Sequence, residues 1–198
     1  MIFRRFTVPP RGLFRALLVA SCIAAPFTGA GAATSPGSMA DDMIAAVNAA
    51  RATEGLVPLT AEPRLAEAAC RQARDLAGKG LYAVADLNHQ GSDGSDLSRR
   101  LADAGYRFRT AAENLAAGVA DPQETVQLWM ASDGHRRNIL TEAFREAGVA
   151  HVGPHLSPAG NRSGPTDVWV LVLAAPGAGL ADPAEQAQNP KDCAAPSE

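Results

Sequence analysis

The sequence predicts an α+β domain, with helices in the first two thirds of the chain and strands in the last third. Four segments carry apolar residues at helical spacing and end at glycines. Two later segments, 148–152 and 168–173, are rich in valine and other strand-forming residues. Because helices and strands do not alternate, we expect an antiparallel sheet covered by helices. Apolar residues make up 46% of the 198 residues, which excludes a wholly disordered chain.

The first helix is predicted over residues 39–54. Ser38 and Asp41 form a capping-box pattern at its start, and Gly55 ends it. One apolar face runs along this helix, made of Met43, Ile44, Val47 and Ala50.

Three further helices are each expected to open at a capping or proline residue and to close at a glycine. The opening and closing residues are Thr60 with Pro63, then Gly78 and Gly80; Ser95, then Gly105; and Asp121 with Pro122, then Gly134. Residues 153–166 are rich in glycine, proline, serine and asparagine, which is typical of a loop between the two strands. Residues 177–198 contain no aromatic residue and are interpreted as a mobile tail.

The first 32 residues have the three parts of a bacterial secretory signal peptide. Four arginines and no acidic residue precede an apolar run at 16–27, and small residues follow at 29–33. Ala30-Gly31-Ala32 fits the cleavage pattern, so the mature chain would begin after Ala32 with a flexible lead-in at 33–39. The apolar run is shorter than the roughly 20 residues that a transmembrane helix needs, so we expect no such helix in the mature protein.

Three alternatives to a plain secretory signal peptide remain open. An uncleaved anchor is the first. Val19-Ala20-Ser21-Cys22 resembles a lipobox, so lipidation at Cys22 would give a lipoprotein. Arg4-Arg5 resembles a twin-arginine signal in a poorly matching context. Plain secretion, or export to the periplasm, requires the fewest assumptions.

Removal of the leader changes the charge and cysteine counts. The full chain carries 18 basic and 21 acidic residues, whereas the mature chain would carry 14 and 21, for a net charge of −7. That acidic balance argues against a nucleic-acid partner. Cys70 and Cys193 would then be the two remaining cysteines, and they are either joined in one disulfide or both free.

Five motifs in order resemble the bacterial branch of the CAP superfamily, which comprises the cysteine-rich secretory, antigen 5 and pathogenesis-related 1 proteins (SCP-like extracellular domains). These motifs are Asn-His-Gln-Gly-Ser-Asp-Gly-Ser at 88–95, Leu-Ala-Asp-Ala-Gly-Tyr at 101–106, Ala-Glu-Asn-Leu-Ala-Ala-Gly at 112–118, the Trp-to-Leu segment at 129–140 with its Gly-His-Arg, and Phe-Arg-Glu-Ala-Gly-Val at 144–149. The segment 47–59 resembles the opening helix and turn of the family. The resemblance assigns residues 40–176 to one such domain.

The resemblance implies an α-β-α sandwich, in which a central antiparallel sheet lies between helical layers. It also implies a cleft in which many eukaryotic members place two histidines and two glutamates that can hold a divalent metal. The first histidine and the first glutamate match His89 and Glu113, whereas the other two positions fall at Ser132 and Ala143. The bacterial Gly-His-Arg motif adds His135, which could supply the missing imidazole.

These residues permit two interpretations. His89, Glu113 and His135 together provide two imidazoles and one carboxylate, which is compatible with a metal such as zinc and one open position. Alternatively, they form a hydrogen-bonded polar cluster that pins the Glu113 segment to a helix end. Ser132 lies three residues before His135 and could share its face, but no nucleophile-elbow pattern surrounds it. A capping role for Ser132 therefore competes with a role as nucleophile.

Three functions follow from this pattern. The first is a secreted module whose polar cleft, near His89, Glu113, His135 and Ser132, binds a small amphipathic, lipid-like ligand or a component of the cell envelope. The second is a hydrolase of peptides or envelope polymers, in which a metal on His89 and His135 activates water and Glu113 acts as base. The third is a non-catalytic envelope protein that interacts through its acidic surface and tail. We favour the binding module, because the resemblance implies it: lipid and sterol binding recurs in this family. The resemblance specifies the fold more closely than the activity, since one fold hosts many functions.

Overall fold

The structure, a computed structural model, describes residues 38–79, 87–153, 167–178 and 193. All of them belong to one unit, Ser35–Glu198. The predicted leader at 1–32, the predicted loop at 153–166 and the predicted tail at 177–198 fall wholly or mostly outside the described residues. Their boundaries therefore stay predictions.

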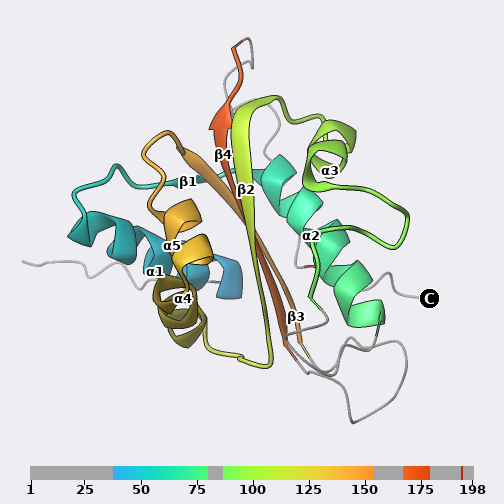
Figure 1. Cartoon of the computed structure of the whole chain (residues 1–198), viewed down its shortest axis with the longest axis horizontal. Coiled ribbons are helices and arrows are strands. Elements are labelled where there is room, and N and C mark those ends of the chain that lie inside the picture. The colour runs from blue at the N-terminus through green and yellow to red at the C-terminus, as the bar shows by residue number, and fades with distance from the viewer. Residues whose placement is uncertain (1–37, 80–86, 154–166, 179–192, 194–198) are drawn as a thin grey trace, which may run out of the picture. The chain divides into compact units, whose positions relative to one another are not determined.

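The described residues form helices and strands in an order close to the predicted one (Figure 1). The helices are α1 (Met39–Thr53), α2 (Pro63–Gly78), α3 (Leu97–Asp103), α4 (Pro122–Ala131) and α5 (Asp133–Ile139). The strands are β1 (Thr60–Ala61), β2 (Phe108–Ala117), β3 (Glu146–Val152) and β4 (Val168–Pro176).

The strands form one sheet in the order β1-β3-β4-β2. β4 pairs antiparallel with both β2 and β3, as the predicted fold requires. The two residues of β1 pair parallel with β3, so the sheet is mixed at this edge. The predicted α+β class is confirmed, and β1 is an addition that no local pattern in the sequence indicates.

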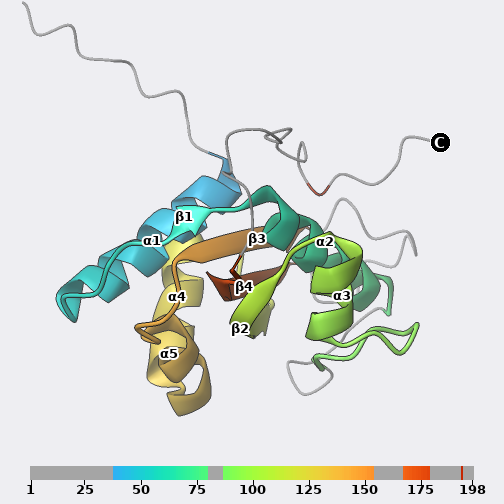
Figure 2. The same ribbon diagram turned by 90° about the horizontal axis from the view of Figure 1, so that it is seen from above.

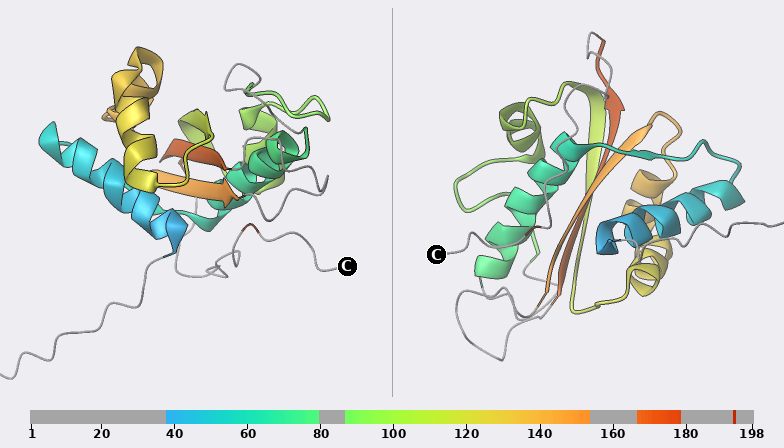
Figure 3. Two further views of the ribbon diagram at one scale, coloured as in Figure 1. Left: turned by 90° about the horizontal axis from the view of Figure 1, so that it is seen from below. Right: turned by 180° about the vertical axis from the view of Figure 1, so that it is seen from behind.

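Helices cover both faces of the sheet. α2 and α3 lie on one face, and α1, α4 and α5 lie on the other, as the views from above, below and behind agree (Figures 2 and 3). Side chains of β4 point alternately into the two layers: Val168, Val170 and Val172 belong to the core under α2 and α3, and Trp169, Leu171 and Leu173 belong to the core under α1 and α4. A strand that is buried on both faces has a continuous run of apolar residues, and for this reason β4 was predicted from its sequence.

Helix-capping signals are partly confirmed. The Ser38–Asp41 capping box opens α1, and Asp121 caps α4 by accepting a hydrogen bond from the Glu124 amide at 2.8 Å. The other two predictions were wrong by one or two residues: Glu62 caps α2, and Asp96 rather than Ser95 caps α3. The backbone amides of Arg64 and Arg99 donate to these two carboxylates at 3.1 and 2.8 Å.

Two segments differ from the prediction. Strand β2 was not predicted, because its alanine-rich sequence contains one β-branched residue, Thr110, and lacks the runs of such residues that mark strands. Its pairing with β4 along its length overrides that weak propensity. The predicted helix from 121 to Gly134 is two helices, because Ser132 adopts an extended conformation and ends α4. The chain then resumes as α5 through Gly134 to Ile139.

The open question about the cysteines is answered. Cys70, on α2, and Cys193 are joined by a disulfide whose Cα atoms are 5.7 Å apart. No helix in the described part of the chain combines the length and apolar character needed to cross a bilayer.

Candidate functional site

Glu113 is the centre of the polar cluster. It lies within β2, in register with Val172 of β4, and its side chain is only 2% exposed. Burying a carboxylate requires partners for both oxygens. Oε1 lies 2.8 Å from Nδ1 of His89, and Oε2 accepts a hydrogen bond from Nη2 of Arg100 at 2.7 Å. Glu113 and His89 are therefore in direct contact.

Arg100 is the residue that sequence analysis missed. It lies on α3, its side chain is fully buried, and its guanidinium neutralises Glu113. Its Nη1 also donates to the backbone carbonyls of His89 and Ser95, each at 3.2 Å. Helical spacing is the one sequence signal that indicates the burial of Arg100. It stands three residues after Leu97 and next to Leu101, on the inward face of a short helix.

The loop that carries His89 is held from several sides. Gln72 of α2 donates to the carbonyl of Asn88 at 2.8 Å, and the Gly91 amide donates to the carbonyl of Ser95 at 2.8 Å. A Cβ at Gly91 would lie 2.6 Å from the Ser95 hydroxyl and 2.7 Å from Oδ1 of Asp93, so these two side chains would have to shift to admit one. The loop is thus closed tightly, and its fixed backbone presents His89.

The His89 ring is oriented but open to solvent. Its side chain is 60% exposed although its Nδ1 contacts the buried Glu113. An ionised carboxylate can only accept a hydrogen bond, so when the ring is neutral the proton resides on Nδ1 and Nε2 keeps its lone pair. The arrangement therefore offers one fixed hydrogen-bond acceptor at the surface.

His135 approaches this cluster from α5, across strand β2. Asn114 is fully buried and donates to the carbonyl of His135 at 3.1 Å, and Asn138 donates to Oδ1 of Asn114 at 2.8 Å. These bonds attach α5 to the strand beside Glu113. Burial first, and then the charge of His89, lower the pKa of His135 from its ordinary value of 6.5. The charge of His89 therefore acts on the His135 ring.

We expect an NMR titration to give His135 a pKa below 6.5. The unfolded chain would then bind this proton at a higher pH than the folded chain, so the free energy of unfolding should fall as the pH drops through 6.5. His89→Ala should raise the pKa of His135 only partly, because burial is the larger cause. A His135 titration that His89→Ala leaves unchanged would contradict this electrostatic coupling of the two histidines.

Ser132 lies at the junction of α4 and α5 and takes the place of the second family glutamate. Its amide donates to the carbonyl of Trp129 at 3.1 Å, and its side chain makes no capping hydrogen bond. Among the described residues, no hydrogen bond joins Ser132 to a histidine, so the pairing that activates a serine is not made there. Ala143 is exposed between α5 and β3, where it offers only a methyl group.

The donor set does not fit a resident divalent metal. Within the described ranges, no three His, Cys, Asp or Glu side chains are arranged to hold an ion. Glu113 has one oxygen on His89 and the other on Arg100, whose buried positive charge would oppose a second cation. The predicted ligand set of His89, Glu113 and His135 is thus not assembled, and the hydrogen-bonded polar cluster is the arrangement that the structure contains.

The comparisons with known proteins agree with this fold. The model of the cysteine-rich secretory protein family, CAP, matches residues 44–172. A protein of Bacillus subtilis (strain 168), described as uncharacterized protein YkwD, is 34% identical over 105 residues, which cover 53% of this chain and 39% of that protein. The chain therefore spans about two fifths of the length of this relative.

Two solved structures share the fold. An extracellular protein containing a SCP domain from Bacillus anthracis matches with a TM-score of 0.55 and 23% identity, over 69% of this chain and 40% of that one. An outer surface protein from Borrelia burgdorferi matches with a TM-score of 0.56 and 17% identity, over 69% of this chain and 94% of that one.

Proposed function

The chain belongs to the cysteine-rich secretory protein (CAP) family, and on that premise we propose that it is an extracellular binding module. Its recognition group is the His89 imidazole, and its ligand is a small amphipathic molecule or a component of the cell envelope. The observation that carries this proposal is the contact series from Arg100 through Glu113 to His89.

That series fixes a polar group before any ligand arrives. Arg100 and Glu113 are buried, whereas His89 is mostly exposed, so the three residues connect the interior of the domain to one surface atom. Preorganisation lowers the entropic cost of binding, because the ring need not be ordered when the ligand docks. An acceptor at Nε2 suits a ligand that presents a hydroxyl, amide or ammonium donor.

Export of this chain is part of the proposal. The predicted signal peptide, the Cys70–Cys193 disulfide and the descriptions of the two structural relatives as extracellular and outer-surface proteins support it. The hydrolase hypothesis has less support, because Ser132 lacks a histidine partner among the described residues and the side chains around Glu113 do not fit a metal.

The test compares binding with stability in His89→Ala. We expect lysophospholipids or soluble peptidoglycan fragments to raise the melting temperature of the native chain and to leave that of His89→Ala unchanged. The unliganded variant should lose only about 1 kcal/mol of stability, because Glu113 keeps its bond to Arg100. Differential scanning fluorimetry provides both measurements, and mass spectrometry of organic extracts identifies any ligand that copurifies.

Gln90→Ala is the matched control, since this exposed side chain lies in the same loop beside His89. It should behave as the native chain with every ligand. Equal shifts in the native chain and His89→Ala, or no shift with either ligand class, would refute the proposal.

A further inference from the structure

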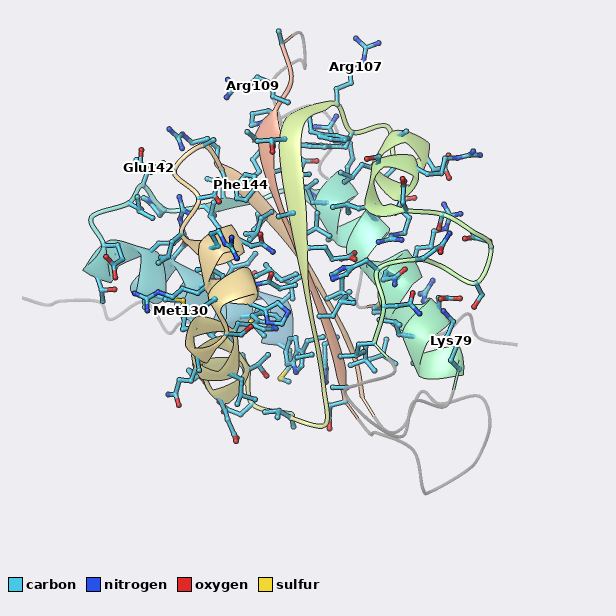
Figure 4. The ribbon with its side chains drawn as sticks, in the orientation of Figure 1. Lys79, Arg107, Arg109, Met130, Glu142 and Phe144 are labelled. Carbon is cyan, nitrogen blue, oxygen red and sulfur yellow. A yellow bond between two sulfur atoms is a disulfide. The ribbon has the colours of Figure 1, made fainter. Side chains whose placement is uncertain are left out.

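Three exposed arginines lie at one end of the sheet, on the two strands that flank β4. Arg107 directly precedes β2, Arg109 is the second residue of β2, and Arg145 directly precedes β3. The Arg145 amide donates to the carbonyl of Ala174, and the Gly177 amide donates to the carbonyl of Arg107, each at 3.0 Å. Both bonds join these segments to the end of β4, and Figure 4 shows Arg107 and Arg109 projecting beyond it. We call the three side chains the arginine patch.

Backbone carbonyls, and not carboxylates, hold two of these side chains. Nε of Arg109 donates to the carbonyl of Pro176 at 3.2 Å. Nη1 of Arg145 donates to the carbonyls of Glu142 and Phe144, at 2.5 and 2.8 Å. Among the described residues, no member of the arginine patch forms an ion pair. The guanidinium groups are therefore oriented by neutral partners, and each keeps further N–H donors for a ligand.

Acidic residues at the same end leave the arginine patch largely uncompensated. Glu146 opens β3, but its carboxylate accepts a hydrogen bond from the hydroxyl of Tyr106. Glu62 pairs with Arg64 at 2.7 Å. Glu142 is exposed in the loop before β3, and its single charge offsets only one of the three arginines.

The charges of the domain are separated along the sheet. Arg51 adds a buried positive charge behind the arginine patch, because burial and then the charge of Arg145 lower its pKa. Strand β2 runs from the patch toward α4, whose first turn carries Asp121 and Glu124 (Figure 1). Salt screens charges over about 8 Å at physiological ionic strength. A ligand at the patch therefore responds to the arginines more than to the acidic total of the chain.

We propose that the arginine patch is a docking surface for an anionic polymer with repeated phosphate groups, such as a phosphodiester polymer of the cell envelope. A guanidinium fork matches the oxygens of a phosphate, and three cations on both sides of β4 suit several phosphates in a row. A bilayer surface fits less well, because no exposed large apolar side chain of the described residues belongs to β2, β4 or the loop before β3; those exposed are Met39, Val57 and Leu128. This inference is independent of the ligand that His89 binds.

Fluorescence anisotropy with labelled inorganic polyphosphate tests the docking surface. We expect the native chain to bind with a slope of log K against log salt of about −2, since three cations each displace about 0.7 counterion from a flexible polyanion. Arg107→Gln, Arg109→Gln and Arg145→Gln should each lower the affinity roughly fivefold and reduce the slope by about 0.7. Arg107 forms no side-chain hydrogen bond with a described residue, so its replacement should leave the melting temperature unchanged.

Lys79→Gln is the matched control, because it removes the same charge from a residue that Figure 4 shows well away from Arg107 and Arg109. It should bind polyphosphate as the native chain does, and so should His89→Ala, which tests the other site. Unchanged affinity in all three arginine variants would overturn the proposal. Inorganic phosphate that competes as well as polyphosphate at equal phosphate concentration, or tighter binding to phosphatidylglycerol vesicles than to polyphosphate, would also overturn it.

Discussion

Replacement of Arg51 by methionine should destabilise the domain by about 4 kcal/mol or more. Arg51 lies on α1 with its guanidinium fully buried. It donates to four backbone carbonyls in three segments, at distances of 2.6 to 3.4 Å; these carbonyls belong to Val57, Ile139, Thr141 and Phe144. The carbonyls of Thr141 and Phe144 also accept hydrogen bonds from the Phe144 amide and from Nη1 of Arg145, at 3.3 and 2.8 Å. Methionine keeps much of the side-chain volume but removes all five bonds of the guanidinium and takes this donor from the carbonyls of Val57 and Ile139. Each buried unsatisfied group costs about 1–3 kcal/mol.

Arg51 acts as a joint between segments that lie far apart in the sequence. The turn after α1, the C-terminal end of α5 and the loop before β3 all meet its guanidinium. Phe144 and Glu142, labelled in Figure 4, mark that loop. Among the described residues no carboxylate pairs with Arg51; burial, and then the charge of Arg145, lower its pKa. The backbone carbonyls and the negative end of the α5 dipole therefore stabilise the charge of Arg51.

Urea denaturation of Arg51→Met, Arg51→Lys and Arg137→Met measures the effect. Arg51→Lys should recover only part of the loss, because an ammonium group cannot reach carbonyls on both sides as the planar guanidinium does. Arg137→Met, which replaces an exposed arginine on α5, should stay within about 0.5 kcal/mol of the native chain. A midpoint for Arg51→Met equal to that of the Arg137→Met control would contradict the role given to Arg51.

Arg51 also shows what kind of information the sequence carried. The segment 47–59 resembled the opening helix and turn of the family, but its residues gave no physical reason for that pattern. In the structure, Asn48 exchanges two hydrogen bonds with the backbone of Leu59, at 2.7 and 2.9 Å, and Arg51 binds the turn between them. The motif thus holds the turn after α1 in place. Its partners beyond residue 59 cannot be predicted from the residues of the motif itself.

The same limit applies to the candidate site. His89, Glu113 and His135 were identified by residue type and motif. The structure places His89 in contact with Glu113, and the charge of His89 lowers the pKa of His135. Arg100 was not identified, because a second arginine in a short helix looks like an ordinary surface charge. Its role depends on a carboxylate 13 residues away on a strand that was itself not predicted. The spacing from Leu97 indicates the inward face of α3, but it does not reveal which carboxylate meets Arg100 there, because tertiary packing sets that pairing.

Replacement of Gly148 by alanine should cost more than about 3 kcal/mol, because the added methyl group meets backbone atoms. Gly148 lies on β3, where the start of α2 packs directly against the strand. A Cβ at this position would lie 2.1 Å from the amide nitrogen of Ala66 and 2.1 Å from the carbonyl carbon of Leu65. No side-chain rotation relieves this contact, so α2 would have to move away from the sheet.

Movement of α2 would loosen one whole core and the candidate site together. α2 supplies Leu65, Ala69 and Leu76 to the core, and its Gln72 holds the loop that presents His89. The melting temperature of Gly148→Ala should therefore fall by roughly 10 °C or more, and amide NMR shifts should change around His89 although it lies far from residue 148 in sequence.

Gly78→Ala is the matched control, at the last residue of the same helix. No atom lies within 4 Å of the Cβ added there, and the backbone of Gly78 is in an ordinary conformation. Alanine in place of a helical glycine reduces the freedom of the unfolded chain, so this variant should gain about 0.5–1 kcal/mol. If Gly148→Ala lowers the stability of the domain and Gly78→Ala raises it, then position 148 requires glycine because a Cβ does not fit there, and not because of backbone freedom. A Gly148→Ala variant as stable as the native chain would contradict the close packing of α2 on β3, in which a Cβ at residue 148 would lie 2.1 Å from the backbone of α2.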